Sequence, residues 1–239
     1  MTLKKLAVAS AIALCMTIPS GTAWADSISI ANPSFEINPG TLSSGCGTGC
    51  TYRMGPIDGW TSGTGAGIWQ PGSLFTAAIP DGSSYLAFAN ATNSISQTLT
   101  GDSVLANSIY TLSVFVGDRI ATPTGTPSGN YTLSLDTIMG GVVTSTLCSV
   151  TDNASKIAPG TFQLESCSYT SLSSVPSGDL FLKLTANSGQ LDVGNVSLTV
   201  QSATTSVPEP SSILLLSIGM VFLLSTLMVS KKQELQLTA

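Results

Sequence analysis

The clearest strand signal in the chain is Ile109-Tyr110-Thr111-Leu112-Ser113-Val114-Phe115-Val116. Successive side chains of a strand point to opposite faces of its sheet, so Tyr110, Leu112, Val114 and Val116 would share one face. All four are apolar or aromatic. The stretch therefore predicts a strand with one face in a hydrophobic core.

Shorter runs of the same kind lie on both sides of this strand. They are Ser27–Ala31, Tyr85–Ala89, Ser94–Leu99, Tyr131–Leu135, Leu180–Leu184 and Val196–Val200. Clusters of Gly, Pro, Ser and Asn separate them at 39–49, 122–130, 158–161 and 187–190. Many short strands separated by turns predict an all-β fold, a β-sandwich or jelly roll, over residues 26–200.

The order of short motifs along this body resembles the galactose-binding-domain-like jelly rolls of exported bacterial proteins. The motifs are Asn32-Pro33-Ser34-Phe35-Glu36, Gly59-Trp60, Gly67-Ile68-Trp69, Pro80-Asp81-Gly82, Ile95-Ser96-Gln97-Thr98-Leu99, Tyr110–Val114 and Asn195-Val196-Ser197-Leu198. The resemblance implies the jelly-roll fold and leaves the ligand open, because one fold serves many functions.

The composition excludes several classes of function. The chain of 239 residues has a net charge of −5 at pH 7 and contains no histidine. A surface rich in acids repels phosphate backbones, so nucleic acid is excluded as a partner. Without histidine the chain has no Ser–His or Cys–His nucleophile system and lacks the commonest general base.

The cysteine count agrees with an exported protein. Beyond Cys15 in the N-terminal apolar segment, the chain has Cys46, Cys50, Cys148 and Cys167. Pairing Cys46 with Cys50 and Cys148 with Cys167 is the simplest of three connectivities. A zinc site built from all four thiolates is the alternative, although the spacings fit zinc ribbons poorly.

The N-terminus predicts a signal peptide over residues 1–25. Lys4 and Lys5 form a positive region, Leu6–Ile18 is mainly apolar, and Ala23-Trp24-Ala25 fits a cleavage site with small residues at Ala23 and Ala25. The mature chain would begin at Asp26. Export through the inner membrane to the cell envelope or the medium follows from this reading.

The C-terminus predicts a membrane-spanning segment. After a Ser/Thr linker at 201–206 comes Val207-Pro208-Glu209-Pro210, and the run Ser211–Ser230 carries no charge. A helix of this length crosses the hydrocarbon core of a bilayer. Lys231 and Lys232 would stay in the cytoplasm with the tail 233–239. A plain membrane anchor is one explanation of this arrangement.

Together the two ends resemble the PEP-CTERM class of bacterial surface proteins. Its sorting signal corresponds here to residues 207–232, with the motif Val207, Pro208, Glu209 and Pro210, then the helix and the basic pair. The resemblance implies an exosortase as a partner, which would cleave near the motif.

The jelly-roll resemblance also implies a structural calcium ion. In that family an acid near each end of the domain ties the first strand to the last, and Glu36 and Asp192 are the candidates here. Carboxylate and carbonyl oxygens suit this hard cation. The alternative is that Glu36 binds nearby backbone and Asp192 is solvated. No other cofactor is predicted.

Aromatic side chains form the second candidate site. Tyr52, Trp60 and Trp69 lie in loop-rich sequence, and flat rings stack on the apolar faces of sugars. Arg119 could add a pair of hydrogen-bond donors. The alternative is that both tryptophans fill the core.

These observations predict a non-catalytic exported protein of the cell surface or extracellular matrix that binds extracellular polysaccharide. A self-associating structural component of the envelope is one alternative. A secreted carbohydrate-active enzyme is another, but eleven scattered acids in residues 26–206 mark no particular catalytic pair.

Overall fold

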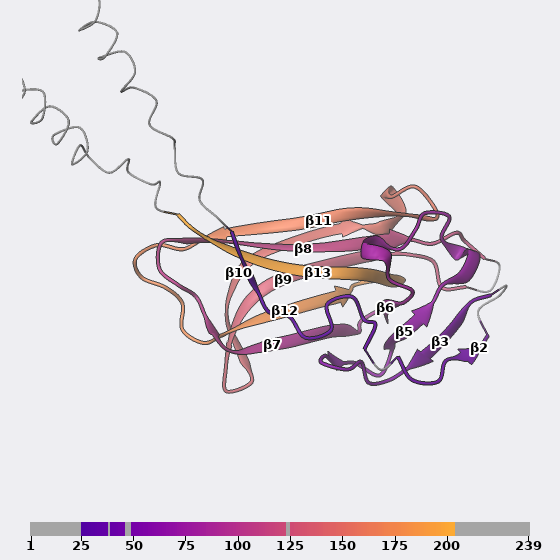
Figure 1. Cartoon of the computed structure of the whole chain (residues 1–239), viewed down its shortest axis with the longest axis horizontal. Coiled ribbons are helices and arrows are strands. Elements are labelled where there is room, and N and C mark those ends of the chain that lie inside the picture. The colour runs from indigo at the N-terminus through magenta and orange to yellow at the C-terminus, as the bar shows by residue number, and fades with distance from the viewer. Residues whose placement is uncertain (1–24, 38, 46–48, 123–124, 204–239) are drawn as a thin grey trace, which may run out of the picture. The chain divides into compact units, whose positions relative to one another are not determined.

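The computed structural model describes residues 25–37, 39–45, 49–122 and 125–203, and it places two antiparallel sheets face to face (Figure 1). The predicted all-β sandwich is confirmed. Its helices in these ranges are three short 3₁₀ turns, η1 (Gly72–Leu74), η2 (Pro80–Gly82) and η3 (Ala154–Lys156).

The larger sheet has eight strands. Its order is β11 (Thr161–Thr170), β8 (Ser108–Asp118), β13 (Gln190–Ser202), β6 (Leu86–Asn90), β5 (Ala66–Gln70), β3 (Thr51–Met54) and β2 (Ser43–Ser44), and β1 (Asp26–Ile28) pairs with β13. The smaller sheet has the order β10 (Val142–Asn153), β9 (Asn130–Met139), β12 (Asp179–Ala186), β7 (Ser94–Ser103) and β4 (Thr61–Ser62).

The hydrophobic core fills the space between the two sheets. On β8 the predicted inward set of Tyr110, Leu112, Val114 and Val116 is buried there, none of them more than 1% exposed. The facing strand β12 contributes leucines in the same alternating pattern. Burying each such side chain contributes about 1.5–3 kcal/mol, so the burial of these inward-facing side chains is the main contribution that holds the two sheets together.

A disulfide links edge strands of the two sheets. Cys148 on β10 bonds to Cys167 on β11, with their Cα atoms 5.8 Å apart. Closing a loop of this size is worth about 3 kcal/mol in the chain-entropy account. Cys50 is buried and also disulfide-bonded, whereas Cys46 lies outside the described residues. Disulfides persist mainly in oxidising compartments, which is the environment that the predicted export requires.

A second apolar cluster lies on the outer face of the larger sheet, the face turned away from the core between the sheets. On β6 the side chains alternate, so that Ala87 and Ala89 belong to the core while Leu86 and Phe88 belong to this second cluster. Gly117 of β8 leaves room for the aromatic rings stacked over it, because a Cβ atom there would come within 2.6 Å of the Phe75 ring. The outer face is therefore partly covered, and it carries the cavity described below.

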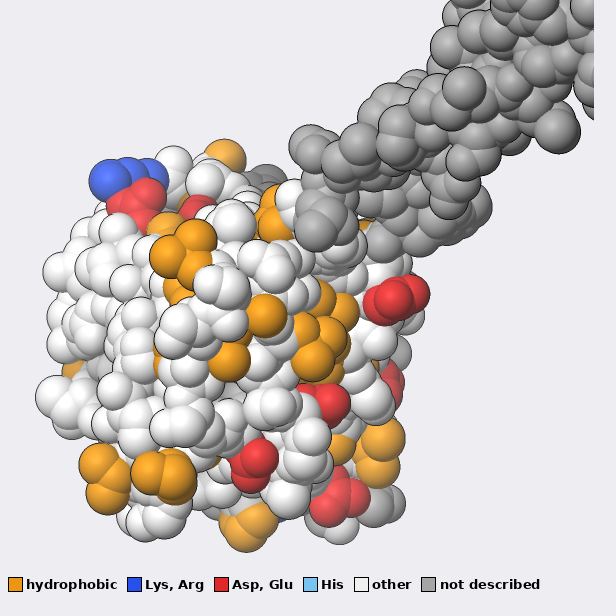
Figure 2. Space-filling view, turned by 90° about the vertical axis from the view of Figure 1, so that its left-hand side faces the viewer, with side chains coloured by type: hydrophobic (Ala, Val, Ile, Leu, Met, Phe, Trp, Pro, Cys, Tyr) orange, Lys and Arg blue, Asp and Glu red, His pale blue; other side chains and the backbone are white. Residues whose placement is uncertain are grey.

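The surface is poor in charge. Figure 2 shows one side of the molecule, where most of the surface is backbone or uncharged polar side chains and few charged side chains are visible. Among the described residues, Lys156 and Asp152 form an ion pair.

The predicted leader, except for Ala25, and the predicted tail after Ala203 lie outside the described residues. These segments include Ala23, the sorting motif 207–210, the segment 211–230 and Lys231–Lys232. Within residues 25–37, 39–45, 49–122 and 125–203, no helix is long and apolar enough to cross a membrane. Strand β13 continues to Ser202, two residues into the predicted linker.

Candidate functional site

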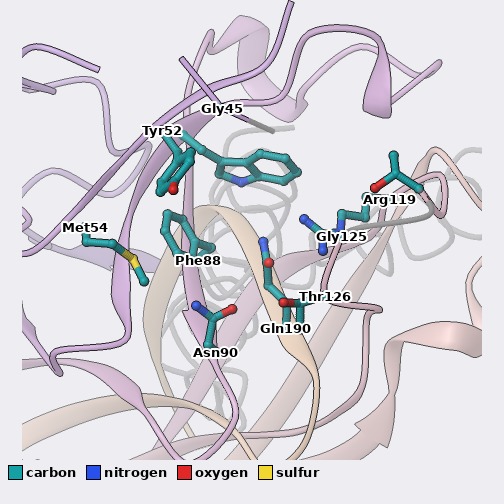
Figure 3. Close-up of a pocket in the computed structure, with 11 residues that line it drawn as sticks. Gly45, Tyr52, Met54, Phe88, Asn90, Arg119, Gly125, Thr126 and Gln190 are labelled. Carbon is teal, nitrogen blue, oxygen red and sulfur yellow. The ribbon is translucent and has the colours of Figure 1, made fainter. Parts of the chain in front are cut away.

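A cavity of about 210 Å³ opens on the outer face of the larger sheet. Strands β3, β5, β6 and β13 supply its floor, and the loop after β8 supplies one wall. Figure 3 shows Tyr52, Met54 and Phe88 on one side of the cavity and Arg119, Thr126 and Gln190 across from them. The lining residues are Gly45, Tyr52, Met54, Trp69, Phe88, Asn90, Arg119, Thr122, Gly125, Thr126 and Gln190.

Three aromatic side chains form the apolar part of this cavity. Tyr52 pairs with Trp69 across β3 and β5, and Phe88 follows on β6. The Tyr52 and Phe88 rings meet edge to face at 6.2 Å, and the Trp69 and Phe88 rings do so at 6.5 Å. Neighbouring strands thus hold the rings in a fixed arrangement that suits a flat apolar ligand.

Arg119 lies against the aromatic wall. Its Cζ atom is 5.7 Å from the centre of the Trp69 ring, close enough for a cation–π contact. The loop packs tightly here, because a Cβ atom on Gly125 would lie 3.2 Å from Nη2 of Arg119. The side chain is only 9% exposed, so a positive charge is held in a largely buried place.

Asp192 lies beside the cavity and is fully buried. It shares a face of β13 with Gln190 and lies opposite Phe88 in the register with β6. Gln190 lines the cavity, and its Nε2 donates a hydrogen bond of 2.6 Å to Oδ1 of Asp192. The carboxyl is therefore held directly behind a residue of the cavity wall.

The surroundings of Asp192 raise the pKa of its carboxyl into the neutral range, so that a large fraction is protonated near pH 7. Burial raises its pKa from 3.8 to about 7, although the Arg119 charge and the Gln190 hydrogen bond favour the ionised form. The nearby Asp118 charge raises the pKa further. A carboxyl of this pKa can donate a proton at physiological pH, as general acids do.

Unpaired polar atoms concentrate around this cavity. Of six buried side-chain atoms without a hydrogen-bond partner among the described residues, four are Nε1 of Trp69, Oδ1 of Asn90, Nη2 of Arg119 and Oδ2 of Asp192. Buried polar groups are nearly always hydrogen-bonded, and exceptions gather at functional sites. Unpaired donors and acceptors around one cavity indicate a binding site for a molecule with polar groups.

The structure brings together three of the four residues predicted to bind a ligand. Tyr52, Trp69 and Arg119 line the cavity. Trp60 instead packs in the core, 5.5 Å from the Phe35 ring, and its Nε1 donates to the Asn32 carbonyl oxygen at 3.1 Å. Trp60 therefore fills the core, as the alternative interpretation of this residue predicted.

The structure gives both predicted calcium ligands other hydrogen-bond partners. Oε1 of Glu36 accepts hydrogen bonds from the backbone N–H groups of Ser84 and Tyr85, at 2.7 and 2.8 Å. Asp192 accepts a hydrogen bond from Gln190 at its Oδ1 atom. Within the part of the chain that the structure describes, no group of three or more His, Cys, Asp or Glu side chains could hold a metal ion.

Phe88, Asn90 and Gln190 also belong to the site, and the sequence reading did not single them out. Phe88 falls inside a predicted strand, where alternation alone cannot tell an outer face with a cavity from a second core. Asn90 and Gln190 stand at strand ends, where polar residues are common and carry no signal of their own.

Comparison with known proteins places the chain among cyclases. The family model for HpiC1-like proteins, described as HpiC1 cyclase, matches residues 26–199. An apo-form cyclase from Fischerella sp. has a similar structure, with a TM-score of 0.61 and 20% identity over 76% of this chain and 98% of that one.

Two structures from Fischerella sp. TAU are also similar. One is the Stig cyclase Fisc in complex with (3Z)-3-(1-methyl-2-pyrrolidinylidene)-3H-indole, with a TM-score of 0.55 and 20% identity over 75% of this chain and all of that one. The other is a cyclase with a TM-score of 0.55 and 21% identity, covering 76% of this chain and 100% of that one. At these identities the likeness shows a shared fold. No curated protein matches the chain.

The family match overturns the predicted function. The prediction of a non-catalytic matrix protein is wrong, because the matching family is one of cyclases. The prediction failed because a single buried carboxyl can act as a general acid without histidine or any recognisable sequence motif.

The predicted partners are corrected with it. The family match favours a small molecule in place of an exosortase and extracellular polysaccharide, and the Fisc structure holds a small molecule. The PEP-CTERM resemblance rests on residues 207–232, and neither the family match nor the described structure supports it.

Proposed function

This chain belongs to the HpiC1-like cyclase family, and from that premise we propose that it closes a ring in a small aromatic molecule bound in the outer-face cavity, with Asp192 as the general acid. The observation that carries the proposal is the position of Asp192. A carboxyl with a pKa of about 7 lies on the same sheet face as three aromatic side chains that line a cavity.

The aromatic walls set the class of substrate. Edges and faces of Tyr52, Trp69 and Phe88 are arranged to contact a flat ring system. The indole ligand of the Fisc structure is such a ring system. We therefore take indoles with an unsaturated side chain as the substrate class to test.

The proposed reaction starts with proton donation. Because Oδ1 of Asp192 accepts from Gln190, the proton of the neutral carboxyl lies on Oδ2, the oxygen without a partner. Transfer of this proton to the substrate's side-chain double bond leaves a carbocation and a carboxylate. A ring carbon then attacks the cation, a carbon–carbon bond forms, and loss of a proton from that ring carbon restores the acid. The product is an isomer of the substrate.

Proton delivery needs access from the carboxyl to the substrate. Asp192 stands behind Gln190, so the Gln190 side chain must turn aside or a water molecule must bridge the gap. Turning the amide also releases a hydrogen bond that favours the ionised carboxyl, which leaves the neutral acid more favoured still.

Replacing Phe88 with alanine tests the place of catalysis. We expect the wild-type protein to convert an alkenyl indole into a product of equal mass and different retention in liquid chromatography with mass detection. Phe88→Ala removes one aromatic wall and should raise KM about tenfold or more. Phe181→Ala is the matched control, because Phe181 pairs with Asp136 in the smaller sheet.

The two variants separate the outcomes. An unchanged KM in Phe88→Ala, or equal losses in both variants, would place the reaction elsewhere. Failure of the wild-type protein to isomerise any indole of a panel with different alkenyl side chains would contradict the proposed substrate class.

A further inference from the structure

We propose that the molecule recognised by this cavity carries a carboxylate beside its aromatic ring, and that Arg119 binds this group. The inference rests on the proposed function, because it concerns the same cavity. It adds a requirement that neither the family match nor the fold contains, namely an anionic group on the substrate.

The first reason is that the Arg119 charge has no close counter-ion. Arg119 is 91% buried, and no acidic side chain of the described ranges forms an ion pair with it. Its guanidinium donates no hydrogen bond to a described residue, and its Nη2 atom is buried without a partner. Buried charges are normally paired, because leaving one unpaired costs several kcal/mol.

The second reason is that Asp192 cannot compensate the Arg119 charge fully. Asp192 interacts electrostatically with Arg119 but forms no ion pair with it. In the protonated form that donates the proton, Asp192 carries no charge at all. In that state Asp192 would not offset the Arg119 charge.

The third reason is the geometry of the donors. Nε1 of Trp69 is also buried without a partner, and the Arg119 guanidinium lies over the same Trp69 ring at 5.7 Å. Two unpaired donors thus belong to neighbouring side chains that line one cavity. A planar carboxylate offers two acceptor oxygens and is the group that a guanidinium fork binds best.

The proposed contact would also position the substrate. An aromatic ring held by Tyr52 and Phe88, with a carboxylate fixed at Arg119, leaves the ring little freedom to turn within the cavity. Fixing the orientation of reacting groups is a major source of rate enhancement. Arg119 is thus assigned as a specificity-determining residue that binds the substrate without taking part in proton transfer.

The test compares two ligands of nearly equal shape. Indole-3-acetate and indole-3-acetamide share the ring and the side-chain length, and only the first carries a charge. We expect isothermal titration calorimetry at about pH 6 to show that the wild-type protein binds the acetate roughly 10- to 100-fold more tightly than the acetamide. This is the gain in affinity expected when a ligand adds hydrogen bonds between charged groups. Arg119→Gln should abolish this preference while the acetamide still binds.

Two further variants complete the test. Arg119→Lys keeps the charge but loses the planar fork, so it should retain an intermediate preference. Arg53→Gln is the matched control, because Nε of Arg53 donates to the Pro39 carbonyl oxygen at 2.8 Å and Arg53 does not line the cavity. This control should preserve the wild-type preference.

Three results would overturn the inference, and they have different meanings. Equal affinity of the wild-type protein for the two ligands contradicts the carboxylate contact alone, and so does a preference that survives Arg119→Gln. Absence of binding by either ligand contradicts the aromatic cavity as well, and with it the proposed function.

Discussion

Replacing Asp192 with asparagine is expected to slow ring closure by roughly 100- to 10,000-fold, the usual contribution of a general acid. Asparagine has nearly the same shape and can still accept the hydrogen bond from Gln190 through its amide oxygen. It has no acidic proton to donate. The loss should therefore appear in kcat, with KM nearly unchanged, when the rate of isomer formation is measured at saturating substrate.

A second buried carboxyl provides the control for this variant. Asp136 on β9 is 3% exposed and also has a carboxylate oxygen without a partner, but it belongs to the smaller sheet. Asp136→Asn should keep kcat within about threefold of the wild-type value. If Asp192→Asn and Asp136→Asn proved equally active, Asp192 would not be the acid.

Asp192→Asn is also expected to make the stability of the folded protein less sensitive to alkaline pH than that of the wild-type protein. The folded-state pKa of Asp192 is about 7 and its ordinary value is 3.8, so between these values the folded state holds a proton that the unfolded state has lost. Raising the pH through this window favours the unfolded state. The stability lost in this way is on the order of 4 kcal/mol, it is complete above about pH 7, and none is lost below about pH 4.

Chemical unfolding at two pH values measures this effect. Between about pH 5 and pH 8, the wild-type protein should lose roughly 3 kcal/mol more of its free energy of unfolding than Asp192→Asn does. The chain has no histidine, so few other groups titrate in this range, and those cancel in the comparison. Parallel losses in the two proteins would show that the Asp192 carboxyl is ionised near its ordinary pKa.

The alternation of side chains was sufficient to predict the core of the fold. Ile109–Val116 lies within β8, and Leu180–Leu184 within β12, because both strands have one face against the core. Strands β10 and β11 are different. They are edge strands, and many of their side chains are half or fully exposed. With little burial to impose an apolar period, their sequences give only a weak strand signal.

The candidate site was only partly predictable, for a related reason. Tyr52, Trp69 and Arg119 could be selected because aromatic and guanidinium groups in loop-rich sequence often bind ligands. Asp192 could be selected too, but as a calcium ligand and not as the proposed acid. Its acidity depends on complete burial next to Gln190 and on a distant Arg119, which only the folded chain brings near.

The absence of histidine was the most misleading feature of the sequence. Its absence excludes the Ser–His and Cys–His mechanisms, and that exclusion still holds. It does not exclude catalysis, because burial raises the pKa of Asp192 into the range where histidine normally works. The commonest catalytic residue can thus be replaced by a carboxyl in an apolar place, which leaves no motif in the sequence.

The central claim is that the Asp192 carboxyl beside the aromatic cavity titrates near neutral pH. Carbon-13 NMR of the side-chain carboxyl groups tests it most directly, with the Asp192 signal assigned as the one that Asp192→Asn removes. The predicted result is a titration midpoint of about 7 for that signal. A midpoint near the ordinary value of 3.8 would contradict the claim, because the carboxyl would then be ionised and unable to donate a proton at neutral pH.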